Sequence, residues 1–176
     1  TGKSTSLYLQ NGVWGSPVEL TGIAADTTNA KFMRLGIHKN LPVTFDELTE
    51  SPAEEVSQLA YGISQGKWKD RVASQANALR KNLTNWCTIV TTSSNSSMYE
   101  KLAAVKNRPD GEMMRILEYR VKTNSELEAD LDLKYMLDIE LKQNYGHAGE
   151  IYAEELVKNL EQWKDKLREW HEKIDR

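Results

Sequence analysis

The sequence predicts an α/β fold, with a parallel sheet at residues 1–122 and a helical region at residues 123–176. Three observations support this: a glycine-containing turn precedes a helical pattern near residue 1, two strand-forming runs end in polar side chains, and helical periodicity dominates after residue 125. The 176 residues are one domain's worth of chain, and 39% hydrophobic with 28% charged residues is ordinary for a globular protein.

Charge is unevenly distributed along the chain, whose formal net charge is -3. Residues 66–82 contain five basic residues and one acidic residue, whereas residues 125–176 contain fourteen acidic and eight basic residues. A basic patch on an acidic chain indicates a localised contact with an anion. Cys87 is the sole cysteine, which excludes a disulfide framework and favours a reducing, cytoplasmic setting. We expect no membrane partner, because no run is long and apolar enough to span one.

The chain begins Thr1-Gly2-Lys3-Ser4-Thr5, which matches the second half of a phosphate-binding loop. In such a loop, backbone N–H groups at a helix N-terminus face the anion, the lysine reaches the terminal phosphates and the hydroxyl binds Mg²⁺. We therefore expect residues 2–5 to bind ATP, and we expect Ser4 to bind Mg²⁺ as well. The feeding strand and the first glycine of the pattern would precede residue 1, so we expect a longer parent protein and little activity from these residues alone.

The elements that follow the loop are short. Residues 4–13 read as a helix that the Gly15-to-Pro17 breakers end, and residues 18–23 read as a strand. Thr27 or Thr28 can cap a helix over residues 29–35.

Residues 41–47, Leu-Pro-Val-Thr-Phe-Asp-Glu, form a strand-like run that ends in two adjacent acids. P-loop ATPases present such a pair at the carboxyl edge of a parallel sheet, so Asp46 would hold Mg²⁺ and Glu47 would polarise the attacking water. The alternative is a turn that caps a helix over residues 52–64. The phosphate-loop pattern some forty residues upstream favours the catalytic interpretation.

Lys67, Lys69 and Arg71 alternate with Trp68 in a glycine-flanked stretch. This alternation suits a hairpin or loop that grips a nucleic-acid backbone, where charge gives affinity and a ring can stack on a base. A solvated connection anchored by Trp68 fits the composition equally well.

Residues 87–94 form a β-branched run that ends at Asn95. At the tip of a neighbouring strand, Asn95 could sense the γ-phosphate or position water, or it could cap a helix over residues 97–105. Residues 115–121 read as a further strand after a turn at residues 107–111. Arg115 is the candidate for an arginine finger, and Arg108, or a surface ion pair of Arg115, is the alternative.

The C-terminal region is predicted to be helical apart from a break at residues 144–149, Asn-Tyr-Gly-His-Ala-Gly. Its last segment carries apolar residues at 4-3-4-3-4 spacing. They are Leu156, Leu160, Trp163, Leu167, Trp170 and Ile174. This stripe could pack on the domain or form a short coiled coil with another helix. The three histidines are too dispersed to indicate a metal cluster.

Several of these motifs together carry a family resemblance over roughly residues 1–160. They are residues 1–5, Trp14-Gly15, residues 41–47, 61–71 and 93–95, the strand around Arg115, and residues 144–149. The chain resembles a phage and mobile-element ATPase family, an uncharacterised domain allied to superfamily-three-like replicative helicases and often found with primase modules. Residues 41–47 and the Gly-His-Ala-Gly segment are its most specific parts.

The resemblance implies an AAA+-like P-loop core that acts as a homo-oligomeric ring, such as a hexamer, in the cytoplasm of a bacterial host. ATP would lie at subunit interfaces and single-stranded DNA in a central channel. By position, the resemblance assigns the binding of nucleotide and Mg²⁺ to Lys3 and Ser4. Asp46 and Glu47 would form the acidic pair. Asn95 would be the sensor of the γ-phosphate, and Arg115 the arginine finger. Basic residues that face DNA in these helicases correspond here to Lys67, Lys69 and Arg71.

Three functions follow from these patterns. The first is the ATPase portion of a replicative DNA helicase, possessing hydrolytic activity in the intact parent. The second is an ATP-dependent switch or assembly factor whose basic stretch contacts protein. The third is a nonenzymatic interaction module with an incomplete ATP site and an acidic helix that binds a partner.

Overall fold

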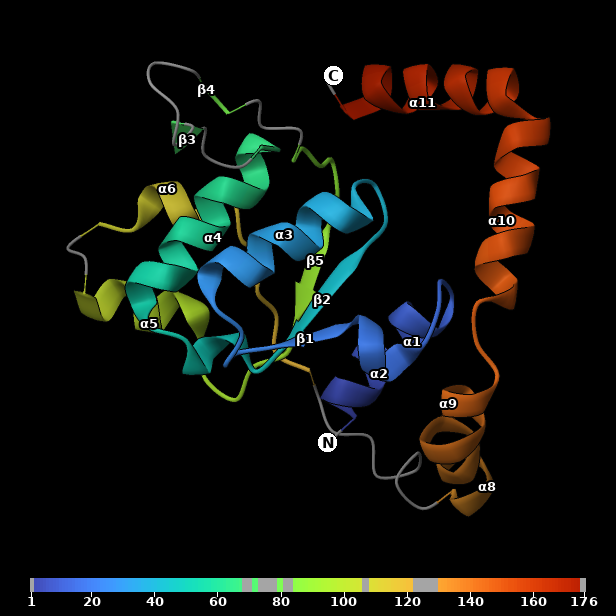
Figure 1. Cartoon of the computed structure of the whole chain (residues 1–176), viewed down its shortest axis with the longest axis horizontal. Coiled ribbons are helices and arrows are strands. Elements are labelled where there is room, and N and C mark those ends of the chain that lie inside the picture. The colour runs from blue at the N-terminus through green and yellow to red at the C-terminus, as the bar shows by residue number, and fades with distance from the viewer. Residues whose placement is uncertain are drawn as a thin grey trace.

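Three short parallel strands carry the core: β1 (Thr21–Ile23), β2 (Val43–Asp46) and β5 (Val90–Thr92). β2 lies in the middle, where Phe45 pairs with Gly22 on one side and with Thr92 on the other. The computed structural model describes residues 2–67, 71–72, 79–80, 84–105, 108–121 and 130–174. The predicted α/β class with a parallel sheet is confirmed, and helices make up most of the rest (Figure 1).

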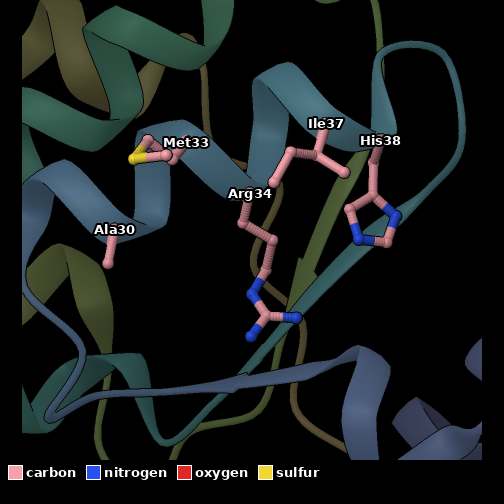
Figure 2. A pocket seen from close by; sticks show the side chains of 5 residues that line it. All are labelled: Ala30, Met33, Arg34, Ile37 and His38. Carbon is pink, nitrogen blue, oxygen red and sulfur yellow. The ribbon is translucent and has the colours of Figure 1, made fainter.

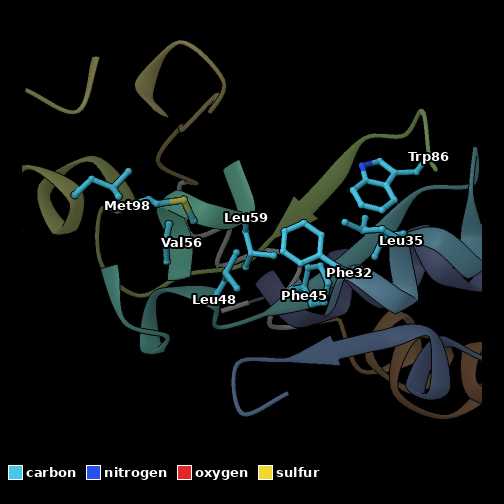
Figure 3. Packing of buried hydrophobic residues seen from close by; sticks show 10 residues of the cluster. Phe32, Leu35, Phe45, Leu48, Val56, Leu59, Trp86 and Met98 are labelled. Atoms are coloured by element: carbon cyan, nitrogen blue, oxygen red, sulfur yellow. The ribbon is translucent and has the colours of Figure 1, made fainter. Parts of the chain in front are cut away.

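The apolar core lies on one face of the sheet (Figure 3). Val43 and Phe45 alternate with Thr44 along β2, so they point to the same side. They meet α3 (Thr28–His38), α4 (Ala53–Gln65) and α5 (Met98–Val105) in a cluster of buried side chains. The cluster comprises Phe32, Leu35, Val43, Phe45, Leu48, Val56, Leu59, Trp86, Met98 and Leu102. Burial on this face ties helices that are distant in sequence to the middle strand.

Polar contacts join the opposite face of the sheet to α1 (Lys3–Gly12). Asn11, 2% exposed, donates its side-chain amide to Thr44 Oγ1 at 2.7 Å and to Thr21 Oγ1 at 2.8 Å. The same amide lies 3.4 Å from the carbonyl of Pro17, which begins α2 (Pro17–Leu20). A single buried side chain therefore links α1 to two strands and to the next helix.

The predicted strand at residues 18–23 is wrong in its first half. Ser16 accepts a hydrogen bond from the backbone N–H of Glu19 at 3.4 Å, and Pro17 occupies the first turn, where its missing N–H costs nothing. A short helix therefore precedes β1. The cap predicted for the next helix is confirmed, since Thr27 Oγ1 accepts from the N–H of Ala30 at 3.3 Å, and α3 runs three residues beyond the predicted end at 35, to His38.

The predicted strand at residues 115–121 is also wrong. The short helix α6 (Asp110–Met113) occupies the expected turn, and residues 116–121 have no regular structure. Glu118 instead accepts from the N–H groups of Met98 at 2.9 Å and Tyr99 at 3.2 Å, at the start of α5. This segment therefore serves as a cap for a helix.

The basic stretch contains an antiparallel strand pair, β3 (Arg71–Val72) with β4 (Leu79–Arg80). This strand pair follows α4 in the chain. Helix α4 begins after the short 3-10 turn η1 (Leu48–Glu50), and Gly66, with a positive φ of 69°, terminates it. Residue 67 bridges to residue 85 next to the pair. The described part of this stretch thus contains two paired antiparallel strands, and Trp68, on which the alternative of an anchored connection depends, lies outside the described residues.

The C-terminal helices form an arm along one side of the domain (Figure 1). It consists of α8 (Leu131–Tyr135), the π-helical η2 (Met136–Glu140), α9 (Leu141–Gln143), α10 (His147–Lys158) and α11 (Leu160–Ile174). The predicted break is present between α9 and α10, where Gly146 has a φ of 85°. None of the described helices combines the length and apolarity that crossing a membrane requires.

The Gly-His-Ala-Gly segment attaches the arm to the end of α1. The N–H of Gly146 donates to the Gly12 carbonyl and that of Gly149 to the Val13 carbonyl, each at 2.8 Å. A Cβ on Gly149 would lie 2.4 Å from the Val13 oxygen, so only glycine allows this approach. Trp14 packs edge-on against Tyr152 with ring centroids 5.9 Å apart.

Replacing Asn11 with alanine should lower the free energy of unfolding by about 2 kcal/mol, because buried oxygens lose their donor and a cavity remains. Chemical denaturation monitored by circular dichroism measures this change. Gln10→Ala is the matched control, because Gln10 is the neighbouring amide on α1 and its side chain is merely half-buried. This change should cost less than about 0.5 kcal/mol. Equal losses in the two variants would contradict the role assigned to Asn11.

Candidate functional site

Polar side chains gather where β2 and β5 end. Asp46 is the last residue of β2 and Glu47 follows it, while Ser93, Ser94 and Asn95 follow β5. Because the two strands are parallel and paired from Val43–Val90 onward, their carboxyl ends lie at the same edge of the sheet. Ligands of open α/β sheets commonly bind at this edge.

Ser93 joins the two acids of the predicted pair. Its hydroxyl, in a side chain that is 7% exposed, hydrogen-bonds Asp46 Oδ1 and accepts from the backbone N–H of Glu47 at 3.3 Å. Sequence reasoning assigned Ser93 no role of its own. No sequence pattern indicated this role, because it follows from the register of the strands, which brings the residue after β5 opposite the end of β2.

Asn95 lies between Glu47 and Lys3. Its amide nitrogen donates to Glu47 Oε1 at 3.1 Å, and its amide oxygen accepts from Lys3 Nζ. Lys3 Nζ also donates to the Ser94 carbonyl at 2.7 Å. The alternative role of Asn95, capping α5, falls instead to Ser97 and Glu118, since Ser97 Oγ accepts from the N–H of Glu100 at 3.2 Å.

The N-terminus of α1 opens toward solvent beside these groups. Gly2 precedes it with a φ of 70°, and no atom of the described residues that could obstruct a side chain lies within 4 Å of the position where a Cβ would be. Within the part of the chain that the structure describes, no side chain caps this end, and the first turn contains no acidic residue. The helix therefore presents uncompensated N–H groups, with Lys3, Ser4 and Thr5 in the first turn. This arrangement attracts anions.

Glu47 has a left-handed backbone, with φ 52° and ψ 38°. A residue other than glycine in this region is strained by about 1 kcal/mol or more, and such strain concentrates at functional sites. The bonds from Ser93 and Asn95 hold the backbone and the carboxylate of Glu47 on both sides. The left-handed backbone thus points the side chain of Glu47 in a different direction from that of the adjacent Asp46.

Two of the predicted site residues carry oxygen donors that suit a cation. Ser4 offers a hydroxyl and Asp46 a carboxylate, which are the hard donors that Mg²⁺ selects. The residues that the structure describes contain no group of three or more His, Cys, Asp or Glu side chains placed to hold a metal. Mg²⁺ bound with a nucleotide needs only one or two protein ligands, so the donors present fit it.

Arg115 lies away from this edge of the sheet. Its Nε donates to Ser64 Oγ at 2.9 Å, its Nη1 donates to the Gly111 carbonyl, and its guanidinium lies 4.6 Å from the ring centroid of Tyr61. These contacts place it between α4 and α6, in the turn that replaces the predicted strand. The alternative finger, Arg108, is exposed.

The predicted basic residues lie after α4. Lys67 is exposed and forms the bridge to Asn85, while Arg71 is paired with Arg80 in the β3–β4 ladder. Lys69 and Trp68 lie outside the described residues.

A shallow hollow on the outer face of α3 contains none of the predicted site residues (Figure 2). It is lined by Ala30, Met33, Arg34, Ile37 and His38. Partial burial, with the nearby Arg34 charge, lowers the pKa of His38 below its usual value, so the imidazole is neutral at pH 7. The hollow therefore lacks the paired polar groups found at the sheet edge.

Comparisons with known proteins give two likenesses. A family described as "Domain of unknown function (DUF927)" matches residues 1–84. A solved structure named "SCCmec type IV Cch - active helicase" is similar with a TM-score of 0.62 and 25% sequence identity, over 97% of this chain. The chain spans 30% of that structure's length. No curated protein matches the chain.

Replacing Ser93 with alanine should loosen the turn after β2, because the N–H of Glu47 and the carboxylate of Asp46 both lose a partner. We expect the free energy of unfolding to fall by about 1 kcal/mol and amide hydrogen exchange at Glu47 to accelerate. Ser96→Ala, an exposed serine of the same loop, is the control. Unchanged exchange at Glu47 in Ser93→Ala would refute this role.

Proposed function

We propose that this chain is the ATP-binding portion of a DNA helicase of the phage and mobile-element type, with a P-loop core that couples hydrolysis to movement along DNA. The observation that carries the proposal is the convergence of Lys3, at the N-terminus of α1, with Glu47 and Asn95 at the edge of the sheet. The likeness to a helicase structure over 97% of the chain supports the class of protein.

In this proposal, Lys3 exchanges its present acceptors for phosphate oxygens. Its ammonium now binds the Ser94 carbonyl and the Asn95 side chain, which hold the cation within reach of the helix N-terminus. A terminal phosphate, with its negative charge, is a stronger acceptor than either neutral oxygen. The transfer leaves the Asn95 amide oxygen free to accept from a nucleophilic water.

Glu47 is the proposed group that orients this water. Its Oε1 accepts from Asn95, which fixes one oxygen of the carboxylate and leaves the second one available. Ser4 and Asp46 would hold Mg²⁺, which neutralises charge that develops on the phosphates. Positioning of water and stabilisation of charge are the main contributions that proteins make to phosphoryl transfer.

The proposed DNA contact is the basic stretch that contains Lys67, Lys69 and Arg71. Phosphate contacts of this kind bind single strands of any sequence and weaken as salt rises. The runner-up, an ATP-dependent switch without strand separation, uses the same site and contacts protein instead. DNA-stimulated ATP hydrolysis by the full-length protein separates the two, since the switch gives none.

The full-length protein carrying Lys3→Ala should fail to bind nucleotide, because the mobile positive charge at the phosphates is lost. Glu47→Gln should keep nucleotide affinity and lose turnover, since an amide is nearly isosteric but cannot act as a base. Titration with a fluorescent ATP analogue and phosphate release measure the two effects. Glu50→Gln, an exposed acid in the next turn, is the control and should match the unmodified protein. ATP hydrolysis at the normal rate by Glu47→Gln would exclude the proposed role.

Arg115 is proposed to act on the nucleotide of a neighbouring subunit in a ring, which requires it to leave Ser64 and Gly111. Arg115→Ala should keep ATP affinity and lower hydrolysis by about 10³-fold, the effect typical of an arginine supplied in trans. Mixing Arg115→Ala with Glu47→Gln should restore part of the activity, because some interfaces then combine both intact residues. Lack of recovery in rings that exchange subunits would rule out action in trans.

A further inference from the structure

The apolar stripe of α11 stays open to solvent in the part of the chain that the structure describes. Its residues follow a 3-4-3-4 spacing, which places them on one face of the helix as the a and d positions of a heptad repeat. Leu160 is 51% exposed, Leu167 49%, Trp170 48% and Ile174 79%. The fifth member, Trp163, has Lys166 Nζ 4.6 Å from its ring centroid. The sequence predicted that this stripe either packs on its own domain or pairs with another helix. The described residues do not adopt the first of these arrangements.

Basic residues line both edges of the stripe. In the heptad that starts at Leu160, the flanking e and g positions are Lys164, Lys166, His171 and Lys173. The acids lie at the outward positions: Glu161, Asp165, Glu169 and Glu172. Two of the lysines already pair along the helix, Lys164 with Glu161 at 2.7 Å and Lys173 with Glu169 at 2.6 Å. These pairs are exposed and contribute little, so the lysines remain available to a partner.

This distribution of charge selects the kind of partner. Two α11 helices packed antiparallel would bring Lys166 against Lys173 at the flanks, and two packed in parallel would bring Lys166 against His171, so neither arrangement pairs a lysine with an acid. Residues 160–174 carry four Lys or Arg and four Asp or Glu, so the helix has no excess positive charge to attract a membrane surface or a nucleic acid. The fitting partner is a second helix with an apolar face and acidic flanks.

The run from α8 to η2 presents such a face. The run is attached to α1 through its continuation α9, where a Cβ on Gly12 would lie 2.8 Å from Leu141 and Lys142 lies 5.6 Å from the Tyr8 ring. Its outer side exposes Leu131, Tyr135, Met136 and Ile139, which are 77%, 56%, 58% and 41% exposed. The exposed ionisable residues of this run are Asp130, Asp132, Lys134 and Asp138. The outer face is therefore apolar and predominantly acidic.

The two faces cannot meet within one molecule as it is folded, because α8 and α11 lie at opposite ends of the arm (Figure 1). We propose that the basic, apolar face of α11 docks on the acidic, apolar α8–η2 face of a second copy of this chain. The contact joins different surfaces of the two copies, so it continues head to tail from one copy to the next. It requires neither ATP nor the residues at the sheet edge.

The test is a charge exchange measured by sedimentation velocity on the 176-residue chain. The unmodified chain should self-associate as its concentration rises from micromolar to near-millimolar. Lys164→Glu with Lys166→Glu and Lys173→Glu should weaken this association by about tenfold or more, and Asp132→Lys with Asp138→Lys should do the same. An equimolar mixture of the two variants should associate again, because each contact between unlike copies pairs opposite charges. Circular dichroism verifies that each variant remains helical.

Two matched single substitutions distinguish a contact made by the apolar face of α11 from an effect of charge anywhere on the helix. Lys166→Glu, beside the stripe, should weaken association, whereas Arg168→Glu, the same change on the outward side, should leave it unaltered. A chain that stays monomeric throughout would assign α11 to another protein and overturn the proposal. Association that survives both charge reversals, or that does not return in the mixture, would also overturn it.

Discussion

The parallel register between β2 and β5 is the constraint on which the candidate site depends. Once Val43 pairs with Val90 and Phe45 with Thr92, the next residues, Asp46 and Ser93, must meet at the carboxyl edge. Side chains separated by almost fifty residues in sequence are brought within hydrogen-bond distance by the pairing of a few backbone groups. Slipping the register by one residue would turn Phe45 out of the core, so hydrophobic burial on one face fixes the polar arrangement at the edge.

The two faces of β2 explain how α1 is positioned beside the polar edge of the sheet. The face that carries Phe45 is held by apolar burial against α3 and α4, whereas Thr44 on the other face is held by the amide of Asn11. A hydrogen bond is directional, so it fixes the position of α1 along the sheet as well as its distance from it. Lys3, two turns earlier, is thereby kept beside Ser94 and Asn95.

The same helix connects the candidate site to the arm. Its far end supplies the Gly12 and Val13 carbonyls that receive the N–H groups of Gly146 and Gly149. The Gly-His-Ala-Gly segment thus serves as a joint, and the glycine at 149 is required by the closeness of the Val13 oxygen. Any displacement of α1 would therefore also move the base of α10, which leads to α11.

The sequence by itself determined the features that depend on neighbouring residues: the α/β class, the helix capped by Thr27, the strand that ends at Asp46, and the periodicity of the C-terminal helices. It misplaced residues 18–20, where Ser16 and Pro17 start a helix, and residues 115–121, where Glu118 caps α5 from a distance. Tertiary structure alone decided that Ser93 would bridge the acidic pair and that the α11 stripe would remain uncovered. Capping and periodicity are local and leave a pattern in sequence, whereas register and docking join residues far apart along the chain and leave none.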